Sequence, residues 1–164
     1  MKKLFVLLLA AVVLGSLGLL PFHAVDAAKL LPVKTVVVTK SGDEYVVDIG
    51  AGVRAVGRTL GEALDRLREE VSGEIFLPTA EQVVVTEPAE EAVEAVAEET
   101  AFRPAAGIYR TPDRAPDPEA LGNYLASHHS NVTILEVRAA LAQGQTPVVP
   151  TIRRTAGGGY QVRE

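Results

Sequence analysis

The chain has 164 residues, a formal net charge of −5 at neutral pH and no cysteine. The lack of cysteine excludes disulfides, thiolate metal sites, a cysteine nucleophile and a lipid attached to an N-terminal cysteine. Because no basic cluster stands out against the acidic balance, neither nucleic acid nor an anionic lipid surface is an electrostatically favoured partner.

Residues 1–27 are predicted to be a secretory signal peptide. Two lysines precede an apolar run from Leu4 to Leu20, and small residues follow up to Ala28. A basic start, an apolar middle and a small-residue exit are typical of an export signal, here with a cleavage site before Ala28. The apolar run is also close to the length of a membrane span, so an uncleaved N-terminal anchor stays open. Either outcome places residues 28–164 outside the cytoplasm.

Two β-branched runs, at residues 33–39 and 44–49, are predicted to form a β-hairpin. The intervening K-S-G-D supplies Gly42 as a turn residue. Glycine adopts the positive φ that tight turns require without steric cost.

The stretch V-V-D-I-G-A-G-V-R-A, residues 46–55, has the outline of the glycine turn that binds dinucleotide phosphates. Such a site needs a helix that begins inside the turn, so that free N–H groups meet the phosphates. The strongest helix start comes later, at Thr59, where Glu62 completes a capping box. An earlier start would place Gly57 and Gly61 in the helix, at about 1 kcal/mol each. We therefore predict a strand exit and a loop, with no nucleotide bound.

Helices and strands are then predicted to alternate, because apolar residues recur first with a helical period and then in short β-branched runs. The expected elements are a helix at 60–71, strands at 74–77 and 82–86, and a helix at 88–99. The acidic outer face of the last helix is interpreted as solvated. A Pro- and Ala-rich segment near residues 103–118 is predicted to be a surface loop.

The remaining segments are two helices and a terminal hairpin. Asp117 is expected to cap a short helix from Pro118 to Ser127. A second capping box, Thr133 with Glu136, opens a helix that ends at Gly144. The last residues, 146–163, form a predicted hairpin around a glycine-rich turn.

Ser127-His128-His129-Ser130-Asn131 is the segment most suggestive of chemistry. Adjacent residues point about 100° apart on a helix and to opposite faces of a strand, so neighbouring histidines rarely share a metal. The third histidine, His23, lies in the signal region. The segment is interpreted as a polar loop between two helices. No hydrolase, metalloprotease or phosphate-binding pattern is present, so we assign no catalytic, cofactor-binding or metal-binding residue and predict a non-enzymatic protein.

The order of elements predicts an α+β fold. After the signal peptide, residues 28–164 are expected to form one domain, in which helices pack on one face of a mixed β-sheet.

This order of segments resembles the N-terminal domain of the Ger(x)C family, the C subunits of bacterial spore-germination nutrient receptors. A glycine-bearing loop leads to T-x-x-E-A-L at residues 59–64, a buried V-V-V strand follows, and G-x-x-P-V-x-P occupies residues 144–150. The resemblance covers roughly residues 33–162. The chain departs from the family in lacking the lipoprotein cysteine that follows the signal peptide.

The resemblance implies a non-enzymatic extracytoplasmic protein, secreted or membrane-associated, at the spore inner membrane if it follows the family. It would act by protein–protein contact in germinant-receptor assembly or spore germination, with other membrane or germination-receptor proteins as partners. An exported binding or adaptor domain unconnected with germination is the alternative that the residues leave open.

Overall fold

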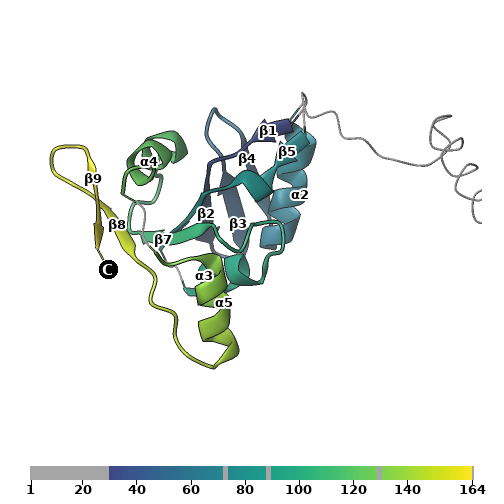
Figure 1. Ribbon diagram of the computed structural model, residues 1–164. Coiled ribbons are helices and arrows are strands. Elements are labelled where there is room, and N and C mark those ends of the chain that lie inside the picture. The colour runs from purple at the N-terminus through teal and green to yellow at the C-terminus, as the bar shows by residue number, and fades with distance from the viewer. Residues whose placement is uncertain (1–29, 72–73, 88–89, 129–130, 164) are drawn as a thin grey trace, which may run out of the picture.

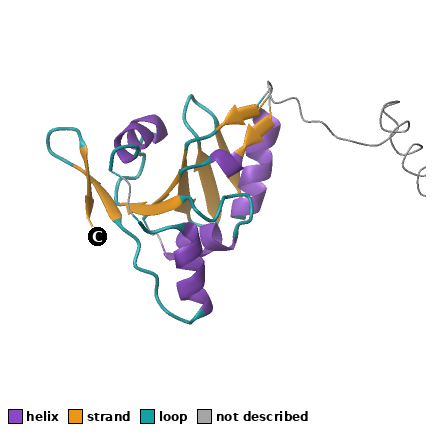
Figure 2. Ribbon diagram, viewed as in Figure 1, coloured by secondary structure: helices purple, strands orange, loops and turns teal. Residues whose placement is uncertain are grey.

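The computed structural model describes residues 30–71, 74–87, 90–128 and 131–163. The predicted signal peptide or anchor therefore lies outside the described residues. Within them, no helix combines the length and the apolar character needed to cross a membrane. Helices and strands both contribute substantially, which confirms the predicted α+β class (Figure 2).

The main sheet is mixed and has seven strands, in the order β4-β3-β2-β6-β7-β8-β9. Strands β2, β6, β7 and β8 are parallel, whereas β3, β4 and β9 are antiparallel to their neighbours. Their bounds are β2 (Thr35–Ser41), β3 (Glu44–Asp48), β4 (Arg54–Gly57), β6 (Gln82–Thr86), β7 (Gly107–Thr111), β8 (Thr151–Arg154) and β9 (Tyr160–Arg163). Both predicted hairpins are confirmed, as β2–β3 and β8–β9.

A second, two-stranded sheet lies beside the main one (Figure 1). It pairs β1 (Leu30–Pro32) in parallel with β5 (Glu74–Phe76), and a 3-10 turn (Leu77–Thr79) leads from β5 to β6. The predicted strand at 74–77 is thus confirmed, although it does not join the main sheet.

Three of the four described helices begin where their caps predict, and the predicted start of the remaining one, at Pro88, lies outside the described residues. The four helices are α2 (Leu60–Glu70), α3 (Glu90–Glu98), α4 (Pro118–Leu125) and α5 (Ile134–Ala142). The side chains of Thr59, Asp117 and Thr133 each accept a hydrogen bond from a backbone N–H in the first turn. These bonds satisfy donors that the helix itself leaves without partners.

Helices cover both faces of the sheet, so the prediction that they pack on one face holds for only three of them. The larger core joins α2, α3 and α5 to alternate strand residues such as Val36 and Val83. The smaller core joins Leu121 of α4 to the intervening residues Val37 and Val84 on the opposite face. Figure 1 shows α4 and the α3–α5 pair on opposite sides of β7. Successive side chains of a strand point to opposite faces of the sheet. A V-V-V run in which every valine is buried therefore needs packed elements on both faces of the sheet.

The predicted surface loop at residues 103–118 is wrong at its centre, where β7 lies. Ile108 and Tyr109 are fully buried, one in each core. β7 is held between β6 and β8 by parallel pairing. The loop is predicted from the Pro and Ala content, which carries no information on strand pairing. Only the flanking segments, which hold Pro104, Pro112 and Pro116, are loops, and Pro118 begins α4.

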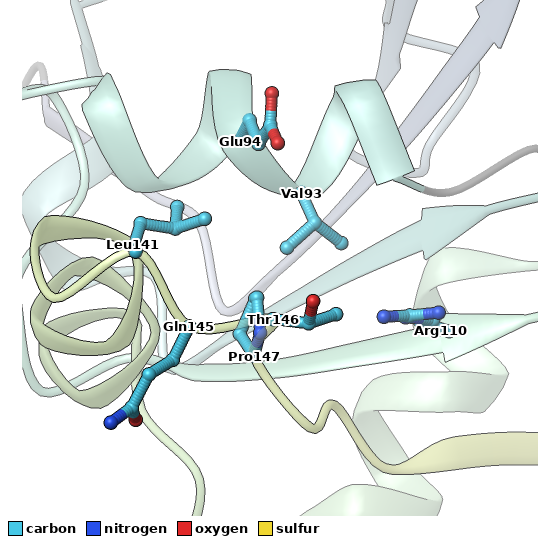
Figure 3. A pocket seen from close by; sticks show the side chains of 8 residues that line it. Val93, Glu94, Arg110, Leu141, Gln145, Thr146 and Pro147 are labelled. Carbon is cyan, nitrogen blue, oxygen red and sulfur yellow. The ribbon is translucent and has the colours of Figure 1, made fainter.

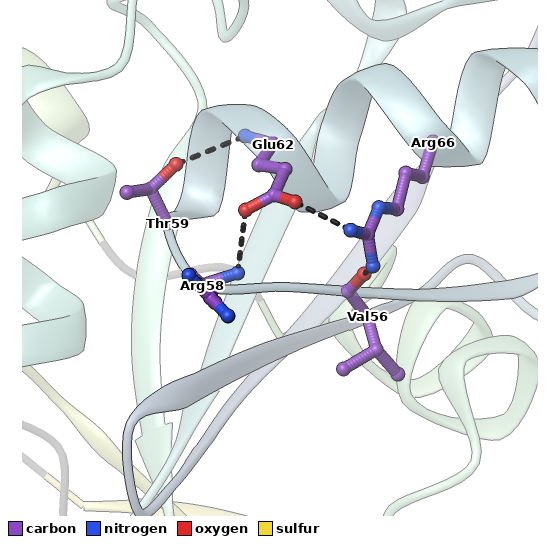
Figure 4. Close-up of polar contacts among 5 residues, drawn as sticks. All are labelled: Val56, Arg58, Thr59, Glu62 and Arg66. Carbon is purple, nitrogen blue, oxygen red and sulfur yellow. Dashed lines mark hydrogen bonds and ion pairs between the residues drawn. The ribbon is translucent and has the colours of Figure 1, made fainter.

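The start of α2 is fixed by a polar network that also reaches β4 (Figure 4). Glu62 N–H donates to Thr59 Oγ1 over 3.1 Å, and Arg58 N–H donates to Glu62 Oε2 over 2.9 Å. In the expected capping box, the Glu62 side chain would accept from the Thr59 N–H. It accepts instead from the N–H of Arg58, one residue earlier. Arg66 pairs with Glu62 and donates to the Val56 carbonyl over 2.7 Å. The network ties the first turns of the helix to the neighbouring strand.

We expect Thr59→Ala to lower the free energy of unfolding by about 1 kcal/mol, because the Glu62 N–H loses its acceptor. Urea unfolding followed by circular dichroism measures this change. Thr59→Ser is the matched control, since it keeps the hydroxyl, and should remain within about 0.5 kcal/mol of the parent. Equal losses in both variants would contradict a capping role.

Candidate functional site

The glycine turn of residues 49–53 joins β3 to β4. Gly50 N–H donates to Asp48 Oδ1 over 2.8 Å, and Val53 N–H donates to the Gly50 carbonyl over 3.0 Å. Gly50 and Gly52 have φ of 84° and 78°, in the region that suits glycine. The turn leads into a strand and α2 begins only at Leu60, so the turn does not open a helix as a dinucleotide-binding turn does. The predicted strand exit is confirmed, but the predicted loop to α2 is wrong in part, because the turn leads at once into β4 at Arg54.

The histidine segment is described only in part, since His129 and Ser130 lie outside the described residues. His128 is exposed at the end of α4, where its ring stacks on Tyr124 with centroids 4.3 Å apart. Its Nδ1 lies 3.0 Å from the Tyr124 carbonyl. Across the described residues, no three side chains of His, Cys, Asp or Glu are grouped so that they could hold a metal ion.

The acidic face of α3 is partly engaged in contacts within the chain. Glu91 pairs with Lys40 at the end of β2. Arg138 of α5 donates from Nε to the Ala97 carbonyl over 2.7 Å, at the end of α3. Glu94 and Glu98 are exposed, in agreement with the predicted solvated face.

Three arginines share one face of the sheet across β7, β8 and β9. Arg110 lies opposite Thr151, and Thr151 lies opposite Arg163, so these residues form a row across the strands. Arg153 and its partner Gln161 lie two positions further along and therefore point to the same side. With strands about 4.8 Å apart, Arg110 and Arg163 are separated by about 10 Å. We call Arg110, Thr151, Arg153, Gln161 and Arg163 the arginine face.

The charges of the arginine face are not neutralised within the described part of the chain. There, no carboxylate oxygen lies within 4.0 Å of a guanidinium nitrogen of Arg110, Arg153 or Arg163. Arg153 and Arg163 are exposed, whereas Arg110 is half-buried. An acidic chain thus presents a local cationic surface.

The opposite side of β9 is held by α4. Tyr124 Oη accepts a hydrogen bond from the Val162 N–H over 3.3 Å, and the Tyr124 and Tyr160 rings lie 5.9 Å apart. Burial raises the pKa of Tyr160 above its ordinary value; Arg154 opposes this effect, and Asp113 and Asp117 add to it. Tyr160 is therefore neutral around pH 7 and acts as a packing residue.

A cavity of about 300 Å³ lies next to the arginine face (Figure 3). Its walls come from Val93 and Glu94 of α3, Arg110 of β7, Leu141 of α5 and the segment 144–147. Thr146 and Arg110 extend toward each other in this view. The cavity therefore combines one cationic side chain, Arg110, with one carboxylate, Glu94, and its other walls are partly aliphatic and partly polar.

Neither the arginine face nor the cavity is among the sequence-based predictions. The sequence hints at the arginine face only through Arg153-Arg154 in the predicted terminal hairpin. Arg110 falls in the segment that is predicted to be a surface loop. No family model matches the chain, and no curated protein or solved structure does so either.

Proposed function

We propose that this chain is a non-enzymatic extracytoplasmic protein that works through protein–protein contact, as its resemblance to germination-receptor C subunits implies. On this proposal, it takes part in germinant-receptor assembly or spore germination. The observation that carries a contact role is the arginine face, whose guanidinium groups form no ion pair with a described residue and of which Arg153 and Arg163 are exposed.

An acidic segment of a partner protein fits this face best. Arg153 and Arg163 offer planar donor groups that bind carboxylates in pairs, with shorter and stronger bonds than neutral donors make. Charge complementarity of this kind also speeds association and disfavours basic partners. The chain as a whole is acidic, so an acidic partner segment would be attracted to the arginine face and repelled by most of the remaining surface.

The test is affinity capture of the tagged full chain from detergent-solubilised membranes of sporulating cells. Where a neighbouring gene encodes a multi-span receptor subunit, we expect that subunit to be recovered with the parent chain. The double variant Arg153→Glu/Arg163→Glu should reduce its recovery at least about tenfold, because each reversed charge repels an acidic partner.

The matched control is Arg58→Glu/Arg103→Glu, which makes the same charge change at two exposed positions away from the arginine face. It should retain recovery. If both double variants lose recovery equally, the loss comes from the change in net charge and not from the arginine face. If the subunit is absent from the parent eluate, or if spores lacking the gene germinate at the parent rate, the germination assignment fails and the unconnected adaptor remains.

A further inference from the structure

Arg110 occupies a position where an apolar side chain would be expected. It lies opposite Val85 on β6, on the side of the sheet that carries the larger core. Several of its neighbours on that side are aliphatic, namely Val85, Ile108 and, from α3, Val93, whereas its partner on β8 is Thr151. The backbone of Arg110 is fixed in place, because its N–H donates to the Pro150 carbonyl over 2.8 Å. The side chain as a whole is half-buried, but its Nε is removed from water, and a buried donor costs free energy unless it is hydrogen-bonded.

Among the described residues, the Arg110 guanidinium has no ion-pair partner. Its Nε is buried and makes no hydrogen bond, and no carboxylate of a described residue lies within 4.0 Å of its nitrogens. Glu94 lines the same cavity and does not form an ion pair with it. Buried polar groups in folded proteins are satisfied in the great majority of cases, so an unsatisfied one calls for an explanation.

The cavity beside Arg110 supplies one. We propose that it binds a small organic carboxylate, with the carboxylate on the Arg110 guanidinium and a short aliphatic part against Val93, Leu141 and Pro147. This site is separate from the protein contact proposed above, because it needs only Arg110 of the arginine face and lies at the junction of α3, α5 and β7 (Figure 3). A volume of about 300 Å³ is at the lower end of ligand pockets, which suits a small molecule.

The charge balance favours a carboxylate over a phosphate. One guanidinium neutralises one negative charge, and the planar fork of arginine matches the two oxygens of a carboxylate. A phosphate would bring additional negative charge toward the Glu94 carboxylate. The aliphatic part of the lining, Val93, Leu141 and Pro147, also favours a ligand with an apolar part, which inorganic phosphate lacks.

Titration of the isotopically labelled full chain in detergent, followed by amide NMR, tests the proposal with sodium butyrate as the probe. We expect saturable shifts at Val93, Arg110 and Thr146, with a Kd of about 1–10 mM, as one charge-assisted contact and a small apolar surface provide. Butylamine, which has the same aliphatic chain and the opposite charge, should produce no saturable shift. Sodium phosphate should bind at least about tenfold more weakly.

Two variants locate the site. Arg110→Gln should weaken butyrate binding at least about tenfold, since it removes the charge and keeps a polar side chain of similar shape. Arg163→Gln, on the arginine face but outside the cavity, should leave the Kd unchanged. Unfolding midpoints of both variants establish that they are folded. The proposal is overturned if butyrate gives no saturable shift, if phosphate binds as tightly, or if folded Arg110→Gln keeps the parent affinity. None of these results bears on recovery of a partner protein.

Discussion

Replacing Gly57 by alanine is expected to lower the free energy of unfolding by about 3 kcal/mol, an effect at the upper end for overpacking. Gly57 ends β4 and is buried against the first turn of α2. A Cβ at this position would lie 2.4 Å from the Ala63 nitrogen and 2.8 Å from the Glu62 carbonyl carbon. These are backbone atoms of a helix, so the clash is relieved only by moving α2 away from the sheet. Urea unfolding followed by circular dichroism measures the loss.

Gly61→Ala is the matched control, four residues away on the same segment. Its Cβ would have ordinary contact only, with Glu99 Oε2 at 3.6 Å. Because alanine is the better helix former, this variant should gain about 0.5 kcal/mol. The same Gly→Ala substitution is thus expected to lower the free energy of unfolding at Gly57 and to raise it at Gly61. If Gly57→Ala stays within about 0.5 kcal/mol of the parent, the close approach of α2 to β4 is wrong.

Leu121→Ala should have an effect of similar size, about 3 kcal/mol of lost unfolding free energy. Leu121 is fully buried in the smaller core, where α4 is the helix that covers Val37, Val84 and Tyr109. That core has few members, so little neighbouring apolar material can fill the cavity. Urea unfolding gives the total change. Hydrogen exchange should also show faster opening of β9, because α4 holds its Val162 N–H.

Asn123→Ala, on the exposed side of α4, is the control for Leu121→Ala. It changes the same helix without touching the core and should remain within about 0.5 kcal/mol of the parent. A Leu121→Ala variant with parent stability would show that α4 contributes nothing to the second face of the sheet.

Most elements were predictable because their signals are local. Thr59 and Thr133 mark two helix starts through short-range bonds, and Gly42 marks the turn of the first hairpin. β4 and β7 escaped prediction for a physical reason. Each is short and contains a glycine and an arginine, R-A-V-G and G-I-Y-R-T, so neither shows the β-branched run that marks β6. The placement of α4 could have been inferred, since three successive buried valines, Val36 to Val38, require cover on two sides.

The arginine face and the Arg110 cavity could not be predicted from periodicity. Their residues lie far apart in the chain, and only the pairing of β7 with β8 brings Arg110 level with Thr151. A one-residue change in that register would send Arg153 to the side of the smaller core. Tertiary pairing, which local patterns do not encode, therefore determines both features.

The hydrogen bonds of Arg66 and Tyr124 have a consequence for behaviour at high concentration. β4 and β9 are the two outermost strands of the sheet, and their free backbone groups could template pairing with another chain. Arg66 occupies the Val56 carbonyl on one strand, and Tyr124 occupies the Val162 N–H on the other. Both lie on helices that stay attached as long as the cores are intact. The covering of these two edge groups therefore depends on helix docking, and loss of either helix would expose one more backbone group for pairing with another chain.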